Sequence, residues 1–170
     1  EVTFVNNLDT HAIIGGGEVQ TFKTNQDAEF FEILSSTLYS NKKLAVVREV
    51  LCNSWDANIE SGKENKPVIV EISDNKMVFK DVGPGIPKDM MGDIYCTYGG
   101  STKRHDGKKT GGFGLGSKSP FAYTESFTVT SHFSGIKNMY LISRVSESNG
   151  GKPGMTSLVR VPTTETGLMV

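Results

Sequence analysis

Apolar residues at helical spacing mark two helices in the N-terminal part of the chain. In the first, they follow Asp27, a residue type favoured at helix N-caps, and predict an amphipathic helix over residues 27–39. A second helix is predicted over residues 44–59, because one apolar stripe runs along it and Gly62 stands just beyond its end. The apolar positions are Phe30, Phe31, Leu34 and Leu38 in the first helix and Val47, Leu51 and Trp55 in the second. We expect Trp55 and the phenylalanine pair to lie in the core.

Apolar runs bounded by turn residues mark the strands. The stretch from Thr10 to Lys23, broken by consecutive glycines, predicts a strand or a hairpin arm. Two runs around a turn at residues 74–76 predict a hairpin, three later runs predict an antiparallel meander, and residues 117–123 suit a short helix. The hairpin strands are 68–72 and 77–79, and the meander strands are 127–133, 138–146 and 156–161.

A glycine-rich region lies between the predicted hairpin and the meander. Asp81-Val-Gly-Pro-Gly85 predicts a turn, since two glycines and a proline cannot continue a central strand. Residues 86–116 then show little apolar periodicity and are rich in glycine, lysine and threonine. Connections of this length in a compact domain are usually functional.

Three polar residues share one face of the second predicted helix. Glu49, Asn53 and Asp56 stand at positions i, i+4 and i+7, opposite the apolar stripe. A solvated helix surface gives the same spacing. The glycine-containing segments that follow in the sequence favour a binding site over that alternative.

The run Gly111-Gly-Phe-Gly-Leu-Gly-Ser-Lys118 invites comparison with phosphate-binding loops. It fits neither the P-loop pattern nor the dinucleotide fingerprint, because Ser117 occupies the position of the required lysine or glycine. The mechanism common to both motifs still applies, since glycines let the backbone approach an anion and the N–H groups of residues 115–118 can point at phosphate oxygens. A flexible linker is the alternative interpretation of this run.

Three segments in this order resemble the motifs of the GHKL ATPases, the superfamily of type II topoisomerase ATPase domains, dimeric heat-shock chaperones, MutL proteins and sensor histidine kinases. The resembling segments are Leu38–Lys42 with Val47–Ala57, then Asp81–Ile86, then Gly111–Lys118. More narrowly, Val47-Arg-Glu49 and the run Gly112–Tyr123 resemble the phage rapid-lysis A-type proteins.

The resemblance implies a fold and an activity. The expected fold is an α/β (α+β) two-layer sandwich, the Bergerat ATP-binding fold, with a mixed, mainly antiparallel sheet and helices on one face. Residues 1–170 would form a single ATP-binding domain, a piece from the N-terminal part of a longer protein, and residues 86–116 would form the lid over ATP. The expected activity is Mg²⁺-dependent ATP hydrolysis coupled to lid closure.

The resemblance also assigns roles to single residues. Asn53 would ligate Mg²⁺, because an amide oxygen suits this hard cation. Glu49 would be the general base that activates water. Asp81 would accept a hydrogen bond from the adenine amino group, Gly83 and Gly85 would let the backbone pass close to the base, and Asp56 would help to position the nucleotide. The remaining nucleotide-binding residues would be Ile86 in the second motif, Ser101, Thr102 and Lys103 in the lid, Gly112, Phe113, Gly114, Leu115, Gly116, Ser117 and Lys118 in the third motif, and Thr156.

Two of these assignments carry alternatives. Lys118 suits either a phosphate contact or the protein surface. Thr156 resembles the strand threonine that joins the aspartate at the adenine, but the family has a Gly-Thr pair and Met155 stands in the place of the glycine. The other basic residues near Lys103 also fit a solvated loop.

Composition limits the partners. With 18 Lys and Arg against 19 Asp and Glu, the net charge of −1 gives no excess for binding nucleic acid directly. No apolar run is long enough for a membrane span, and two cysteines without a CxxC motif fit a reduced, cytoplasmic protein, which would be the host cytoplasm for a phage protein. The three histidines have no metal-ligand spacing.

We expect an adenine nucleotide as the ligand, and the superfamily makes a homodimer of the full-length protein an open alternative. Two other functions compete with hydrolysis. One is a nucleotide-binding module of the histidine-kinase type, and the other is a module that acts by binding a host protein. Glu49, one turn before Asn53, favours hydrolysis.

Overall fold

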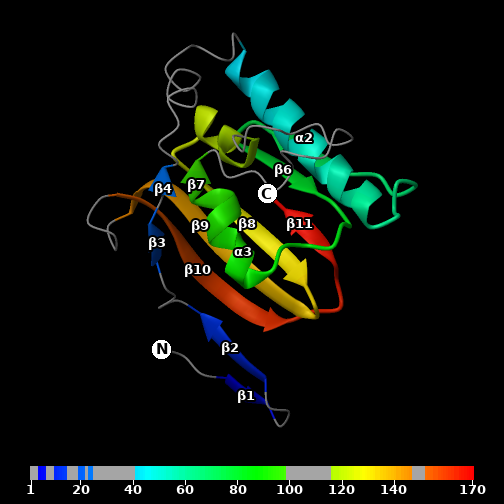
Figure 1. The fold of residues 1–170 in the computed structure, drawn as a ribbon, viewed down its shortest axis with the longest axis vertical. Helices are drawn as coiled ribbons and strands as arrows, with labels where there is room; N and C mark the ends of the chain where they lie inside the picture. The colour runs from blue at the N-terminus through cyan, green and yellow to red at the C-terminus, as the bar shows by residue number, and fades with distance from the viewer. Residues whose placement is uncertain are drawn as a thin grey trace.

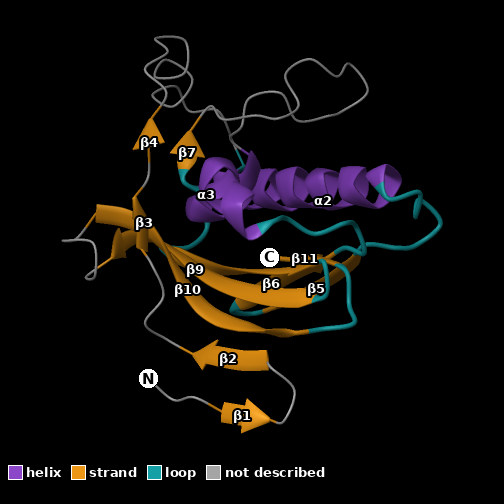
Figure 2. Cartoon of the chain, turned by 60° about the horizontal axis from the view of Figure 1, so that its bottom comes forward, coloured by secondary structure: helices purple, strands orange, loops and turns teal. Residues whose placement is uncertain are grey.

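Helices cover one face of a large β-sheet. The computed structural model describes residues 4–6, 10–14, 19–21, 23–24, 41–98, 116–146 and 152–170. In these residues the helices are α2 (Lys42–Glu60), α3 (Lys88–Tyr95) and a 3₁₀ helix, η1 (Gly116–Ala122). Figures 1 and 2 show α2 and α3 on the same side of the sheet, and η1 contacts both helices. The predicted two-layer α+β sandwich is confirmed.

Among the described residues, nine strands form one sheet. They are β1 (Phe4–Asn6), β2 (Thr10–Ile14), β3 (Val19–Thr21), β5 (Ile69–Ser73), β6 (Lys76–Lys80), β8 (Ser126–Phe133), β9 (Ile136–Ser146), β10 (Lys152–Pro162) and β11 (Gly167–Met169). Their order is β1-β2-β10-β9-β8-β11-β6-β5, with β3 also on β10. Every pairing within this sheet is antiparallel. The parallel pairing found in the described residues joins β4 (Lys23–Thr24) to β7 (Thr97–Tyr98) in a separate sheet.

The ends of α2 follow from local signals. The Asn41 side chain accepts a hydrogen bond from the backbone N–H of Leu44 at 3.0 Å, which satisfies a free donor of the first turn. At the other end, Gly62 has a φ of +65°, a left-handed conformation that suits glycine after a helix. The predicted helix over residues 44–59 is therefore confirmed.

The buried side of α2 is not the predicted stripe. Val46 and Val50 are buried and pack with Phe79 of β6, whereas Leu51 and Trp55 are 36% and 44% exposed. The expectation that Trp55 lies in the core is wrong. The reason is that α2 carries apolar residues on more than one side, so their spacing alone does not show which side meets the sheet.

The core consists of two clusters. The larger lies beneath α3 and η1 and contains Met91, Tyr95, Cys96, Phe121, Val129, Tyr140, Ile142 and Met155. The smaller lies beneath α2, and the side chain of Val170 packs against both. Within the larger cluster the Phe121 and Phe127 rings meet edge to face at 5.0 Å.

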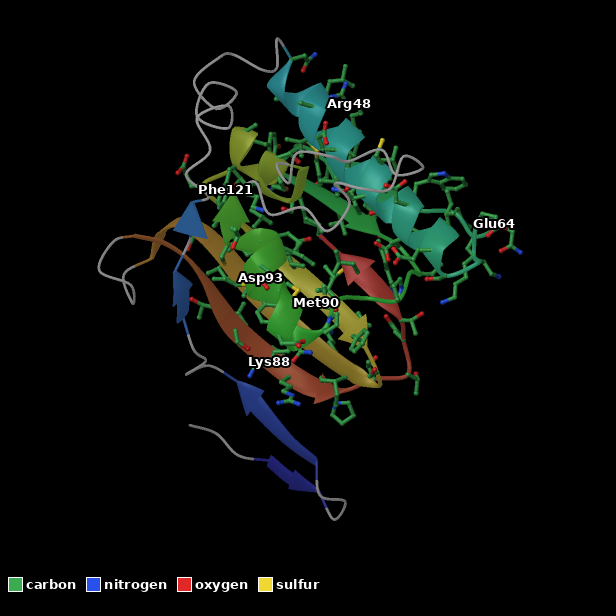
Figure 3. All side chains as sticks on the ribbon, in the orientation of Figure 1. Arg48, Glu64, Lys88, Met90, Asp93 and Phe121 are labelled. Atoms are coloured by element: carbon green, nitrogen blue, oxygen red, sulfur yellow. The ribbon has the colours of Figure 1, made fainter. Side chains whose placement is uncertain are left out.

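Helix α3 occupies part of the segment in which the sequence predicted a long connection. Met91 is fully buried and Tyr95 is 4% exposed, so this short helix belongs to the core. Figure 3 shows Lys88, Met90 and Asp93 along the same helix. Residues 99–115 of the predicted lid and the predicted helix over residues 27–39 lie outside the described residues.

Strand β11 was not predicted, yet it joins the two halves of the sheet. Its residues pair with β8 on one side and with β6 on the other. The hairpin β5–β6 and the meander β8–β9–β10 follow the predicted ranges closely. In the part of the chain that the structure describes, no helix is long and apolar enough to cross a membrane.

Candidate active site

The polar face of α2 meets the start of η1. A Cβ atom placed on Gly116 would lie 3.0 Å from the Asn53 side-chain nitrogen and 3.1 Å from the Oε2 atom of Glu49. Both of these side chains are half-buried, and Asp56, farther along the same face, is 8% exposed. The structure therefore brings the predicted Glu and Asn against the end of the glycine-rich run, and a residue larger than glycine at position 116 would crowd them.

One oxygen of the Glu49 carboxylate is bound by its neighbour. Arg48 donates a hydrogen bond to Oε1 at 2.9 Å, and the guanidinium itself is largely exposed. Figure 3 labels Arg48 on α2 and Phe121 on η1, the two elements that pack together here. The other carboxylate oxygen, Oε2, is the one that lies near the Gly116 Cβ position.

Asp81 is a buried carboxylate at the end of β6. It is 2% exposed, and its Oδ1 atom accepts hydrogen bonds from the backbone N–H groups of Gly83 at 3.0 Å and Leu168 at 2.9 Å. Burial raises the pKa of the Asp81 carboxyl above its ordinary value, while these two N–H donors, the Ser54 hydroxyl and the Lys63 charge oppose the shift. The carboxylate is held in one orientation in a site shielded from water.

The glycines after Asp81 allow close packing. A Cβ atom on Gly83 would lie 2.7 Å from the Cβ of Ala57, so α2 approaches the turn directly. Gly85 has a φ of +74°, and a Cβ there would collide with the backbone of His132. Next to it, both backbone groups of Ile86 bind the Ser131 hydroxyl at 2.8 Å. These contacts fix the turn between α2 and β8.

Ser117 and Lys118 face α3. The Ser117 hydroxyl donates to the carbonyl of Ile94 at 2.8 Å, and the Lys118 ammonium donates to the same carbonyl. Lys118 is 5% exposed, so its surface alternative is wrong. Burial lowers the pKa of Lys118 to about 8 and raises the pKa of the nearby Cys96 to about 11.

A comparison with known protein families identifies the family of this chain. The sequence profile of the histidine kinase-, DNA gyrase B- and HSP90-like ATPases matches residues 39–159. The chain belongs to this family. A comparison with curated protein sequences gave no match. The matched range covers α2, the Asp81 turn, η1 and strands β8 and β9, and it supports nucleotide binding with ATPase- or kinase-type activity in general.

The structure does not bring Thr156 to Asp81. Three strands, β9, β8 and β11, separate β10 from β6. In addition, Met155 lies opposite Ile142 and packs in the larger core cluster, so Thr156, one residue later, points to the other face of the sheet. The strand beside Asp81 is β11, where Leu168 stands. Leu168 contributes its backbone N–H to Asp81, and the side-chain hydroxyl bound to the carboxylate comes from Ser54 of α2.

The structure describes some of the predicted nucleotide-binding residues and omits others. Those outside the described residues are Ser101, Thr102, Lys103, Gly112, Phe113, Gly114 and Leu115. Those that lie together around α2, the Asp81 turn and η1 are Glu49, Asn53, Asp56, Asp81, Gly83, Gly85, Ile86, Gly116, Ser117 and Lys118.

Several residues around the site were missed by the sequence analysis. They are Ser54, Asn58, Lys63, Ser131 and Leu168, which bind the backbone or the side chain of residues 81–86. The sequence contains only a weak signal for these residues. Ser54 and Asn58 are polar residues one turn apart on α2, but the same side of the helix also carries the apolar Val47.

Proposed function

We propose that this protein binds Mg²⁺-ATP between α2, the Asp81 turn and η1, and hydrolyses it. The observation that carries the proposal is the approach of Gly116 to Asn53 and Glu49, at 3.0 and 3.1 Å from a Cβ position. It joins a hydrophilic helix face to the end of a glycine-rich run some sixty positions later in the chain. Phosphates bound by that run would lie beside a carboxylate and an amide.

Recognition of the base is proposed for Asp81. The backbone donors on Oδ1 fix the carboxylate, and a buried acceptor selects a ligand that presents a donor, such as the adenine amino group. Guanine presents a carbonyl oxygen at the corresponding position. A guanine carbonyl facing the Asp81 carboxylate would bring two acceptors together in a buried site, which is costly and favours adenine.

Glu49 is the proposed general base. Arg48 holds Oε1, which leaves the Oε2 side of the carboxylate facing the Gly116 end of the site. A carboxylate there can orient a water molecule and accept its proton as the water attacks the γ-phosphate. Positioning supplies most of the acceleration in phosphoryl transfer, so the fixed geometry of Glu49 matters as much as its basicity.

The residues present fit a Mg²⁺ ion. Asn53 is half-buried on the polar face of α2. Because Gly116 has no side chain, this face can lie close to the end of the glycine-rich run. Mg²⁺ prefers oxygen ligands and is usually held by few protein groups together with substrate phosphates. When bound, the ion would neutralise charge on the β- and γ-phosphates, and Asn53 is the residue proposed to hold it.

The proposal includes closure of the predicted lid, residues 86–116, on ATP binding. Its first part contains α3, which buried Met91 and Tyr95 anchor to the core. A lid that closes over the phosphates would exclude water from them and couple the nucleotide state to a conformational state.

The proposal also includes a biological role, which rests on the resemblance to phage rapid-lysis A-type proteins. It suggests a role in the timing of host-cell lysis, a location in the host cytoplasm and a dimer of the full-length protein. Sedimentation of the full-length protein with and without ATP tests the last of these, and a constant monomer contradicts it.

Two substitutions test the mechanism. Glu49→Ala should keep ATP affinity within about twofold and lower turnover by 100-fold or more, because general base catalysis contributes on the order of 10²–10⁴. Asp81→Asn should weaken ATP binding about tenfold or more, because the adenine amino group would face a neutral amide in place of a carboxylate. Binding is measured by calorimetry and turnover by phosphate release, with Glu64→Ala, in the exposed loop after α2, as the matched control.

Three outcomes would contradict the proposal in different ways. Equal turnover of the wild-type and Glu49→Ala proteins would make the hydrolytic mechanism wrong. Unchanged ATP affinity in Asp81→Asn would exclude the adenine assignment. No ATP binding by the wild-type protein would favour a module that acts through a protein partner.

A further inference from the structure

The Val82 peptide groups, between Asp81 and Gly83, are bound from both sides by side chains. Its N–H donates to the Oδ1 atom of Asn58 at 2.9 Å, and its carbonyl accepts a hydrogen bond from the Lys63 ammonium at 2.7 Å. Backbone groups in a turn next to a binding site usually find backbone or water partners. Two side-chain partners on one residue fix its peptide planes, and with them the direction of Asp81.

Asn58 is buried, and hydrogen bonds hold both its side chain and its backbone. It is completely buried in α2, and its amide nitrogen donates to the carbonyl of Lys66 at 3.1 Å. Its own carbonyl accepts the N–H of Lys63 at 2.8 Å. The two partners of Val82 are therefore bonded to each other through the backbone and act as one unit.

Lys63 reaches across two segments. Besides Val82, its ammonium donates to the hydroxyl of Thr166 at 3.0 Å, in the loop that leads into β11. The same strand supplies the Leu168 N–H to Asp81. Lys63 thus ties the end of α2 to both segments that hold the carboxylate, and its positive charge lies close enough to favour the ionised form of Asp81.

We propose that Asn58 and Lys63 are positioning residues that hold the Val82 peptide and thereby set how well Asp81 recognises a nucleotide base. This inference rests on the proposed nucleotide-binding function, because it assigns these two residues an effect on the same site. Neither side chain needs to touch the nucleotide. They act through Asp81, by limiting its orientation and by supplying a compensating charge.

The test compares Lys63→Met with Lys63→Arg, which keeps a cation that can donate to Val82, and with Lys66→Met, which removes an exposed charge three residues away. Calorimetry with ADP–Mg²⁺ and GDP–Mg²⁺ measures the affinities. We expect Lys63→Met to bind ADP about tenfold more weakly, since loss of a hydrogen bond to a charged group costs about the free energy of a tenfold change in affinity. The ratio of ADP affinity to GDP affinity should also fall. Lys63→Arg and Lys66→Met should stay within about twofold of the wild type.

The pH profile separates positioning from a general loss of structure. Among the titratable side chains that the structure describes, Lys63 from the loop after α2 acts on the pKa of Asp81 by its charge, and the Asp81 charge in turn raises the pKa of Tyr95 from α3. Removing the Lys63 charge raises the pKa of Asp81 further, so the acid limb of ADP binding should move to higher pH in Lys63→Met alone. A purely structural lysine would lower affinity without moving this limb.

The possible results separate a failure of the positioning role from a failure of the proposed function. If Lys63→Met matches the wild type in affinity, base preference and pH profile, the positioning role is wrong, while the proposed function stands. If the wild-type protein binds neither nucleotide, the proposed function is wrong and the positioning role with it. Should Lys63→Met fail to fold, Thr166→Val, an isosteric change at an exposed acceptor of Lys63, must weaken ADP binding about threefold; unchanged binding overturns the proposal.

Discussion

At the scale of single residues, Lys118 shows how burial changes the chemistry of a side chain. Its ammonium donates to the last turn of α3, where the helix dipole favours a cation. Burial nevertheless lowers the pKa of Lys118 to about 8, whereas an unfolded lysine titrates near 10.4. Between these two values the unfolded state binds more protons than the folded state, so this residue makes stability rise with pH over that window.

Lys118→Met removes this titration. We expect the unfolding free energy of the wild type to rise relative to that of the variant by on the order of 2 kcal/mol between pH 7 and pH 10. Urea unfolding at both pH values measures the difference, and Lys88→Met, an exposed lysine on α3, serves as the control. A difference that stays constant with pH would show that Lys118 is not a buried cation in solution.

At the scale of elements, the contact between α2 and the Asp81 turn is set by small residues. Gly83 and Ala57 meet so closely that an added Cβ would lie 2.7 Å from the Ala57 methyl group. The φ of Gly83 is outside the left-handed region, so its need for glycine comes from packing and not from backbone conformation. This contact sets the distance between the helix that carries Glu49 and the turn that carries Asp81.

Gly83→Ala should therefore push α2 away from the turn. We expect a loss of about 1–3 kcal/mol in stability, typical of overpacking, together with weaker nucleotide binding. Ala57→Gly should restore part of both losses in the double variant, because it removes the nearest of the colliding atoms. Thermal unfolding and calorimetry of the two single variants and the double variant measure this coupling, and strictly additive effects would contradict direct contact.

The elements also show which parts of the fold local sequence can encode. The C-terminal end of α2, the β5–β6 hairpin and the meander were predicted, because a glycine after a helix, turn residues and apolar runs are local signals. Helix α3 was missed, since it is eight residues long, contains Gly92 and buries only Met91 and Tyr95. Strand β11 has three residues, too few to show a period.

The candidate site was predictable to the extent that it lies on motifs. Glu49, Asn53 and Asp81 stand in conspicuous patterns, and the structure brings their elements together. Thr156 was misplaced because strand order depends on long-range pairing, which puts Leu168 beside Asp81. Asn58 and Lys63 were missed for the same reason, since their partner Val82 lies 24 and 19 positions away.

At the scale of the whole molecule, the proposed ligand should stabilise the fold. A ligand that binds only the folded state adds about 2.7 kcal/mol at 100 times its Kd. We expect ADP with Mg²⁺ to raise the thermal unfolding midpoint by several degrees, and EDTA to remove most of that increase. Scanning calorimetry with ADP, ADP–Mg²⁺ and ADP with EDTA measures both effects, and identical midpoints in all three would contradict Mg²⁺-dependent binding.

The place of β11 also has a consequence for how the chain folds. This strand separates β8 from β6, so among the described strands the hairpin after α2 and the meander have no direct edge in common. The two halves can form early from local contacts, but the continuous sheet requires residues 167–169. Pairings this distant in sequence slow folding and leave strand edges open in the meantime. On the ribosome, the Asp81 carboxylate would thus gain its Leu168 partner only after a further 87 residues have been synthesised.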